Sequence, residues 1–375
     1  MIYVHIVQFH LMQGGGVGSV ITDVAEQMVK NKAEVYVFSL FKSDSDNMLK
    51  QKKWAHMSKV MVKTIQQDGD NYLSIILKLR NEIKKLSQTD KVALFLHLKW
   101  GVLAGVLATI GLKKIICIEV YHSGYMRYKL QASVCKYFID SYIAVSNEAK
   151  SQLTNYFKIS PKKISVISNG VDIEAIKTII STKHRNNDGF NFLSVGRLSY
   201  EKGFDISIRG YISFIKMQYS EQVSYSMVGD GPDMSKCKTI SDGKVDFWGN
   251  VPRIQVFEFI RDSDIVVMPS LWEGNSILLL EVLAVGKAVI VSDIPSFREV
   301  LCFSPLEDTE EYRIEKFGIV CRKGSANSFA LAMKWSFNNK EEVLKMSHVI
   351  GALADKYSIK NQSVKYMEIA RKQEV

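Results

Sequence analysis

Apolar and polar positions alternate along the first half of the chain in a way that predicts strands and helices in turn. Short apolar runs, typical of buried strands, are separated by amphipathic segments such as the helix expected at residues 72–86. The strands that we expect are 3–9, 34–40, 92–97, 115–121 and 141–145. Alternation of this kind predicts a mostly parallel sheet covered by helices, which is an α/β fold.

The same pattern begins again in the second half. The expected strands are 190–195, 224–228, 245–248, 265–268 and 288–291, and the expected helices are 206–216, 253–261 and 277–285. Two successive doubly wound units predict two Rossmann-like domains facing across a cleft, with ligands at the carboxyl ends of the strands. We expect one domain over residues 1–168 and a second over 169–352. A helical tail, 353–375, could pack back on the first domain.

The composition predicts a soluble, cytoplasmic protein. The five cysteines lack the spacing of a zinc site, and we expect reduced thiols. The N-terminus has no basic segment of the kind that opens a signal peptide. The longest apolar stretch, 101–112, is too short to span a bilayer and follows Lys99, so we expect a core helix there.

Positive charge is concentrated in the first half. Residues 1–168 hold 23 Lys and Arg against 12 Asp and Glu, a net charge of +11, whereas the remainder carries −1. A solvated basic surface without a partner is one interpretation. No nucleic-acid-binding motif accompanies the charge, so we expect no nucleic acid. An anionic membrane face or a diphosphate-bearing acceptor fits the charge better.

Two carboxylates stand out in the second half. Glu273 lies in a small polar loop after an apolar strand, and Glu281 lies in the apolar helix that follows. A buried helix seldom holds a carboxylate without a partner. The helix start offers backbone N–H groups to phosphates, while the two acids suit hydroxyl groups.

Two further loops follow strands and suit a phosphate. Gly14 to Gly18 is glycine-rich but is not a dinucleotide fingerprint, because Ser19 replaces the third glycine. It is either a tight turn or a close approach to a ligand. Arg197 and Lys202 follow another strand, and two fixed cations suit a diphosphate.

Four other features have a structural interpretation, a functional one, or both. His122 ends a strand and could contact a ligand hydroxyl or transfer a proton, or it could be a buried structural histidine. His97 ends another strand, but its loop offers no further chemistry, so we rank it lower. The turn at 228–232 could let a ligand approach the backbone. Residues 124–140 interleave aromatic and basic side chains, as in a core helix with solvated charges or a membrane-contacting surface.

Together these segments resemble the retaining glycosyltransferases of family 4, which have the GT-B fold. The resemblance covers nearly the whole chain in the right order. Its more specific parts are the G-R-x4-K segment and the E-x7-E segment. The matching segments are Gly14 to Gly18, His122, 168–172, 195–203, 228–232, 247–251, Glu273 to Glu281 and 289–293.

The resemblance implies a role for each matching residue. Arg197 and Lys202 would hold the diphosphate of a nucleotide sugar. Glu281 would bind the ribose hydroxyls, and Glu273 the donor sugar. His122 would contact the sugar near the reacting face. The remaining donor contacts would come from Gly15, Gly16, Val251, Asn275, Ser276 and Ile277. No metal and no other cofactor are expected, because the two cations and a helix N-terminus supply positive charge.

Three residues depart from the family pattern. Asn275 and Ser276 follow Glu-Gly where an aromatic or small residue and then Pro or Gly are frequent, although Ser276 could cap the helix. The donor sugar preference is therefore open. Lys287 replaces a small or apolar residue, and we expect it to lie on the surface.

The sequence therefore predicts a hexosyltransferase that moves a hexose or N-acetylhexosamine from a nucleotide diphosphate sugar. UDP-sugars are favoured, with GDP-mannose next. The acceptor would be a polyprenyl-diphosphate-linked glycan of O-antigen or capsule (lipopolysaccharide or polysaccharide) biosynthesis, at the inner face of the cell membrane. One alternative is a GT-B sugar-nucleotide epimerase. Another is a non-catalytic binding protein, although the four charged residues of the donor site are all present.

Overall fold

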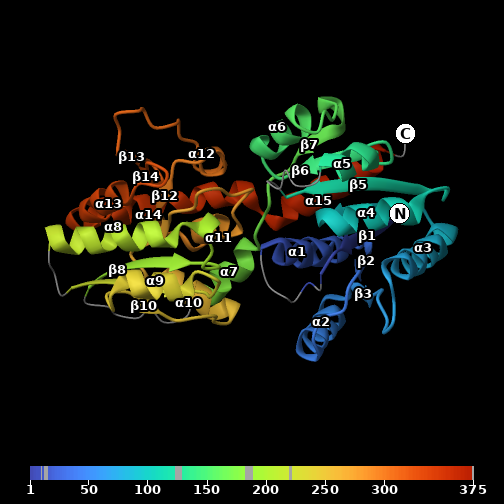
Figure 1. The fold of residues 1–375 in the computed structure, drawn as a ribbon, viewed down its shortest axis with the longest axis horizontal. Coiled ribbons are helices and arrows are strands. Elements are labelled where there is room, and N and C mark those ends of the chain that lie inside the picture. Colours follow the sequence, from blue (N-terminus) through green and yellow to red (C-terminus); the bar gives the residue numbers. More distant parts are fainter. Residues whose placement is uncertain (10, 12–15, 123–128, 182–188, 219–221, 374–375) are drawn as a thin grey trace. The chain divides into compact units, whose positions relative to one another are not determined.

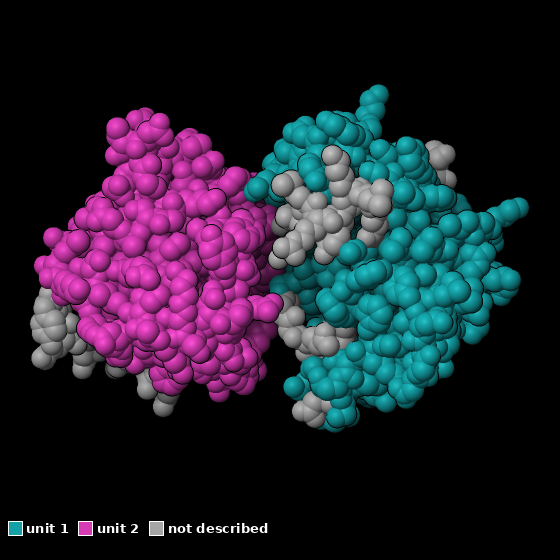
Figure 2. Space-filling model, in the orientation of Figure 1, with its two compact units in different colours: residues 1–170, 359–375 teal, residues 171–358 magenta. Residues whose placement is uncertain are grey.

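The computed structural model describes residues 1–9, 11, 16–122, 129–181, 189–218 and 222–373. The chain divides into two compact units (Figure 2). Unit 1 comprises Met1–Gly170 and Ile359–Val375, and unit 2 comprises Val171–Ser358. The divisions fall after Gly170 and Ser358, whereas the sequence placed them after 168 and 352.

Unit 1 is a parallel sheet of seven strands in the order β3-β2-β1-β4-β5-β6-β7, with helices packed against it (Figure 1). Its strands are β1 (Ile2–Val7), β2 (Glu34–Ser39), β3 (Met61–Thr64), β4 (Val92–His97), β5 (Ile115–Tyr121), β6 (Ser141–Ala144) and β7 (Ile164–Val166). Its helices are α1 (Gly16–Lys30), α2 (Ser45–Ser58), α3 (Tyr72–Thr89), α4 (Leu98–Thr109), α5 (Lys129–Cys135), α6 (Asn147–Asn155) and α15 (Ile359–Lys372).

The C-terminal helix α15 packs on unit 1. It contacts α1, and the fully buried Tyr366 ring lies 5.2 Å from that of Phe95 on β4. The Gln362 side chain accepts a hydrogen bond of 2.7 Å from the Gly170 backbone N–H. The last turns of the chain therefore complete the core of the first sheet.

Unit 2 repeats this design with strand order β10-β9-β8-β11-β12-β14-β13, in which β13 is antiparallel to β14. Its strands are β8 (Phe190–Val195), β9 (Val223–Val228), β10 (Asp246–Phe247), β11 (Ile265–Met268), β12 (Ala288–Ser292), β13 (Tyr312–Glu315) and β14 (Gly318–Cys321). Its helices are α7 (Ile173–Ile180), α8 (Phe204–Met217), α9 (Met234–Ser241), α10 (Arg253–Asp262), α11 (Ile277–Val285), α12 (Pro295–Leu301), α13 (Ala326–Asn338) and α14 (Lys340–Ala354).

The central strands of unit 2 are continuously apolar because both faces of the sheet are covered. In β11, Val266 and Met268 belong to one core cluster, and Ile265 and Val267 belong to another. Side chains of a strand point alternately to opposite faces, so each face receives its own apolar layer. All four residues of β11 are almost fully buried.

The strand orders place a switch point in each sheet. In unit 1 the chain runs outward from β1 to β3, and then from β4 to β7 on the other side. In unit 2 the corresponding neighbours are β8 and β11. Loops that leave such a pair diverge to opposite faces, and ligands of doubly wound sheets bind in the resulting crevice.

The sequence predicted the fold class correctly: the protein is an α/β protein with two Rossmann-like units, as in the GT-B fold. The cleft between the units stays a prediction. The core helix expected at 101–112 is present as α4, three residues earlier. No described helix is both long and apolar enough to cross a bilayer.

Candidate functional site

Two loops at the switch point of unit 2 are bound tightly together. One follows β8 and carries Arg197 to Gly203, and the other follows β11. The Leu271 backbone N–H donates a 2.8 Å hydrogen bond to the Glu201 carbonyl. Gly203 has a left-handed backbone (φ 63°), and a Cβ atom there would lie 2.4 Å from the Pro269 carbonyl oxygen. Only glycine permits this approach without a shift of the backbone.

The same two loops bring Lys202 and Glu273 into contact. Lys202 Nζ lies 2.5 Å from Glu273 Oε1, and the Ser270 hydroxyl donates to that oxygen at 3.0 Å. The side chains are 26% and 12% exposed, so the pair is partly screened from solvent yet reachable. Beside it, the Tyr200 and Trp272 rings lie 5.7 Å apart. Lys202 and Glu273, which the sequence predicted to bind the same ligand, therefore lie next to each other.

Arg197 stands in the same loop as Lys202 but is exposed. Its backbone carbonyl accepts a 3.3 Å hydrogen bond from the Ser199 hydroxyl, but no hydrogen bond or ion pair joins its guanidinium to another of the residues that the structure describes. Its guanidinium is therefore available to an anion, and its planar fork suits two oxygens of a phosphate.

The helix after Glu273 begins as the sequence predicted. Ser276 precedes Ile277, the first residue of α11, and its hydroxyl accepts a 3.4 Å hydrogen bond from the Leu279 N–H. Asn275 and Ser276 are 8% and 5% exposed. Gly286, with a left-handed backbone, ends the helix. The first N–H groups of α11 therefore lie at the carboxyl end of the sheet, where anions are stabilised.

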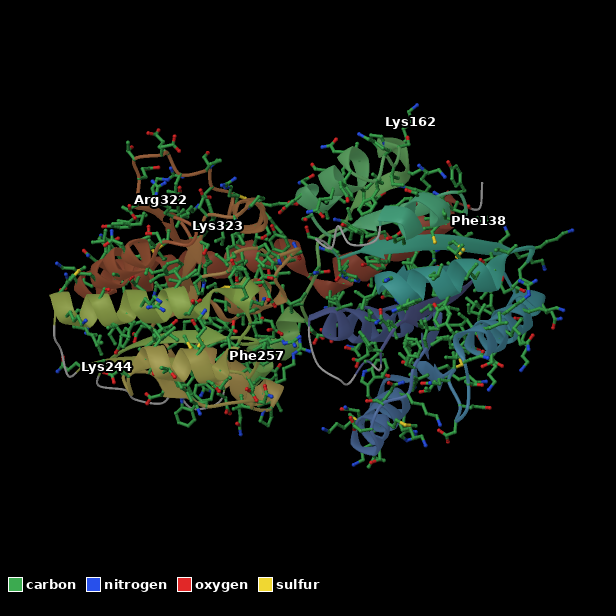
Figure 3. All side chains as sticks on the ribbon, viewed as in Figure 1. Phe138, Lys162, Lys244, Phe257, Arg322 and Lys323 are labelled. Carbon is green, nitrogen blue, oxygen red and sulfur yellow. The ribbon has the colours of Figure 1, made fainter. Side chains whose placement is uncertain are left out.

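Glu281 is buried in α11 and paired. Its Oε1 lies 2.9 Å from Nη2 of Arg253, whose guanidinium also lies 5.7 Å from the centre of the Phe257 ring, labelled in Figure 3. Sequence reasoning missed Arg253, although it begins α10 two residues after Val251. Val251 itself packs, half-buried, against the core that includes α11. Val251, Arg253 and Glu281 thus form a second group, connected to the first through α11, which follows the Glu273 loop.

The glycines of the turn after β9 have a packing role. A Cβ atom at Gly229 would lie 2.0 Å from the Gly196 carbonyl oxygen, and one at Gly231 would lie 2.3 Å from that of Leu198. The backbone of Leu198 donates to Asp230 and accepts from Asp233. These glycines let the turn pack directly against the Arg197 loop, which holds that loop in place.

His122 belongs to a different group, in unit 1. Its Nε2 lies 3.0 Å from Nδ1 of His97, and His97 Nε2 lies 3.0 Å from Nδ1 of His5. Burial lowers the pKa of His122 to about 4, so the imidazole is neutral near pH 7. His97, which the sequence ranked lower as a functional residue, is the hydrogen-bonded partner of His122.

The glycine loop of unit 1 is only partly described. Gly15 lies outside the described residues. Gly16 is exposed and is the first residue of α1. A Cβ atom at Gly18 would lie 2.7 Å from the Leu11 carbonyl oxygen, which gives that glycine a packing role.

Other expectations concern surface and metal chemistry. Lys287 is not a surface residue: it is partly buried, its ammonium donates to the Ser263 carbonyl at 2.6 Å, and burial lowers its pKa. Within the described ranges, no group of three or more His, Cys, Asp or Glu has the arrangement of a metal site.

The chain is similar to two glycosyltransferase families. The model of Glycosyltransferase Family 4 matches residues 14–175, and that of Glycosyl transferases group 1 matches residues 189–339. The two matches correspond closely to the two units.

Curated relatives match part of the chain. An uncharacterised glycosyltransferase of Methanocaldococcus jannaschii is 27% identical over 49% of this chain and 48% of its own length. The UDP-Gal:α-D-GlcNAc-diphosphoundecaprenol α-1,3-galactosyltransferase of Escherichia coli is 30% identical over 40% and 42%. The chain thus spans less than half the length of these relatives.

Solved structures match the whole chain. A glycosyltransferase from Rickettsia africae superposes with a TM-score of 0.76 at 16% identity, covering 99% of this chain and 98% of its own. HepE from Anabaena, solved with UDP and glucose, gives a TM-score of 0.77 at 15% identity, covering 99% and 100%. At this identity the likeness establishes the fold.

Proposed function

We propose that this chain, a member of the family 4 glycosyltransferases, transfers a hexose or N-acetylhexosamine from a nucleotide diphosphate sugar. In the proposed reaction the sugar keeps its anomeric configuration. The observation that carries the proposal is the pairing of Lys202 with Glu273 at the switch point of unit 2. A cation for the diphosphate and a carboxylate for the sugar hydroxyls stand side by side there. Loop packing, and not chance proximity, fixes their separation.

In this proposal, the donor binds along the carboxyl edge of β8 and β11. Arg197 and Lys202 hold the diphosphate, and the backbone N–H groups from Asn275 to Ile277, at the start of α11, add positive potential. Glu273 accepts hydrogen bonds from the sugar. When the diphosphate arrives, Lys202 is shared between a phosphate oxygen and Glu273. The two cations and the helix end supply the charge that a metal supplies elsewhere, so we propose metal-independent transfer.

The second group would hold the nucleoside. Glu281 accepts hydrogen bonds from the ribose hydroxyls, and Val251 lies beside the base. Arg253 pairs with the buried Glu281 side chain and orients it before the donor binds. UDP is the favoured nucleotide. Support comes from the Escherichia coli relative, whose name states a UDP-Gal donor, and from the complex of HepE with UDP. GDP-mannose is the next candidate.

Chemistry at the anomeric carbon proceeds by front-side substitution. The bond from carbon to phosphate oxygen breaks, and its electron pair leaves with the nucleotide diphosphate. The acceptor oxygen forms the new bond on the same face, and its proton passes to the departing phosphate. His122 contacts the sugar or the acceptor as a neutral imidazole. Gly15 and Gly16 approach the donor from unit 1.

A lipid-linked glycan is the proposed acceptor, as in O-antigen or capsule assembly at the inner face of the membrane. The Escherichia coli relative acts on a diphosphoundecaprenol-linked sugar by its name, and a Klebsiella pneumoniae relative is described as lying in a cps region. In unit 1, Val134, Tyr137 and Phe138 (labelled in Figure 3) are 56%, 78% and 46% exposed, beside Lys136. Exposed aromatic and basic side chains suit an anionic bilayer surface.

The donor site is tested by binding, with thermal shifts and titrations of UDP-, GDP- and ADP-sugars. Arg197→Ala should weaken the best donor by roughly 10-fold to 100-fold, because a charge-assisted hydrogen bond contributes about 1.5–3 kcal/mol. The matched control is Arg209→Ala, which removes an exposed arginine on α8. Equal binding by wild type and Arg197→Ala, or no binding of any nucleotide, would contradict the proposal. Recovery of an epimerised nucleotide sugar would indicate the epimerase instead.

A further inference from the structure

Three histidines in unit 1 form a continuous hydrogen-bonded row across neighbouring strands. His5 lies in β1, His97 ends β4, and His122 follows β5. The two hydrogen bonds are both 3.0 Å, and successive rings are stacked with centres 5.2 and 5.3 Å apart. His5 also stacks with Phe95 of β4, with ring centres 5.0 Å apart. We call these three residues the histidine row.

Each ring in the row carries a single proton. His5 and His97 are 0% and 1% exposed. Burial lowers the pKa of His5 to about 3 and that of His97 well below its usual value, and other imidazoles of the row lower both further. A neutral imidazole has one N–H donor and one acceptor nitrogen, so each hydrogen bond of the row must take its proton from one side only.

His97 uses both of its nitrogens within the row, which leaves two arrangements. In the first, His5 Nδ1–H donates to His97, and His97 Nδ1–H donates to His122, so that His122 keeps its proton on Nδ1. In the second, every bond is reversed: His122 Nε2–H donates to His97, and its Nδ1 is left as an acceptor. The protonated nitrogen of a histidine is set by the hydrogen bond that its other nitrogen makes.

The buried end of the row decides between the arrangements. His5 Nε2 is buried and meets no hydrogen-bonding partner among the residues that the structure describes. The first arrangement places a lone pair there, and the second places an N–H group. A buried N–H without an acceptor is the rarer and costlier of the two, because donors are almost always satisfied. The first arrangement is therefore favoured.

We infer that His97, held by His5, is a positioning residue that fixes His122 as an Nδ1–H donor. The inference rests on the proposed function, because it gives His122 a role toward the substrates. As a donor, His122 recognises an oxygen that accepts a hydrogen bond, such as a sugar hydroxyl, an acetamido carbonyl or a phosphate oxygen. As a neutral donor it does not remove the proton of the acceptor hydroxyl. That agrees with passage of this proton to the leaving phosphate.

The surroundings of His122 add two charged groups. A cavity of about 370 Å³ in unit 1 is lined by His122 together with Glu119 of β5 and Lys99 of α4. Burial raises the pKa of Glu119 to about 7. Because the carboxyl is half protonated near neutral pH, experiments on His122 should be compared with a Glu119→Gln background.

The test is nitrogen NMR of the full-length protein with labelled histidine, without any ligand, at pH 7.5. We expect His5, His97 and His122 all in the Nδ1–H tautomer, the minor form of free histidine. The exposed His56 and His348 provide the reference for the ordinary tautomer. A dominant Nε2–H form at His122 or His97 would overturn the inference, whatever the protein is later found to catalyse.

Two substitutions then connect the tautomer to turnover. His97→Leu removes the donor, so His122 should shift toward Nε2–H and kcat should fall by roughly threefold to tenfold, the effect of one hydrogen bond. His97→Asn places an amide N–H near the Nδ1 position and should preserve both the tautomer and most of kcat. His56→Leu is the matched control. If His97→Leu leaves the His122 tautomer unchanged, or if Asn fails to restore it, His97 has no positioning role. Absence of turnover in every variant with correct tautomers would contradict only the proposed function.

Discussion

Substituting Gly203 by alanine should damage the donor site through the backbone. Two effects add. The left-handed conformation at φ 63° disfavours any residue with a Cβ atom by about 1–2 kcal/mol. The added carbon would also stand 2.4 Å from the Pro269 carbonyl oxygen, and such overpacking adds about 1–3 kcal/mol. The free energy of unfolding should therefore fall by about 2–5 kcal/mol.

Gly243 separates the two effects. Its backbone is also left-handed, at φ 73°, but a Cβ atom there would meet nothing within 4 Å. Gly243→Ala should therefore lose about 1–2 kcal/mol, from conformation alone. Denaturant unfolding of both variants gives the difference between them, which measures the contact of Gly203 with Pro269.

The loop contact also predicts an effect on binding. Relief of the clash requires the Lys202 loop to move away from the Glu273 loop, so Gly203→Ala should weaken UDP-sugar binding in titrations, whereas Gly243→Ala should not. If Gly203→Ala is no more destabilising than Gly243→Ala, or if it binds the donor as wild type does, then the loops are not fixed by this contact and the reasoning fails.

Two further predictions address the buried carboxyl groups. Glu281→Gln should weaken UDP binding by roughly 10-fold or more but leave pyrophosphate binding unchanged, because the carboxylate binds the ribose. Calorimetric titrations measure both affinities, and an equal loss for the two ligands would refute the assignment of Glu281 to the ribose. Burial raises the pKa of Glu119 from 4.5 to about 7, so the folded protein holds a proton that the unfolded chain releases across this window. As the pH rises from 4.5 to 7, the unfolding free energy of wild type should therefore fall by at most about 3 kcal/mol relative to that of Glu119→Gln. If the unfolding free energies of the two proteins instead change in parallel with pH, the pKa of Glu119 is not raised.

Many strands could be predicted from the periodicity of apolar residues, and the candidate site residues from the polar side chains that follow those strands. The strands at 92–97, 115–121, 190–195 and 265–268 were predicted with the bounds that the structure shows, because each run is mostly apolar and mostly buried. Lys202 and Glu273, both of which the sequence assigned to the donor, lie in contact because both follow strands that are neighbours at the switch point. Local pattern was sufficient wherever a residue's position follows from the strand that precedes it.

Other features depended on contacts that no local pattern shows. The partner of Glu281, Arg253, comes from α10, and its spacing from Glu281 in the sequence has no periodic meaning. His97 looked unremarkable beside His122, because their hydrogen bond joins two strands 25 residues apart. Lys287 was expected on the surface, yet its ammonium reaches a carbonyl group at the end of α10. Short edge strands such as β3 and β7 are too brief for periodicity to detect.

The central claim is retaining sugar transfer, and the most direct measurement is the anomeric configuration of a product. The purified protein would be incubated with the UDP-sugar that stabilises it most and with a polyprenyl-diphosphate-linked sugar, and the new linkage would be examined by proton NMR. Starting from an α-linked donor, the account predicts an α-linked product that is lost in Arg197→Ala and kept in Arg209→Ala. A β-linked product, or a product formed equally by both variants, would contradict it.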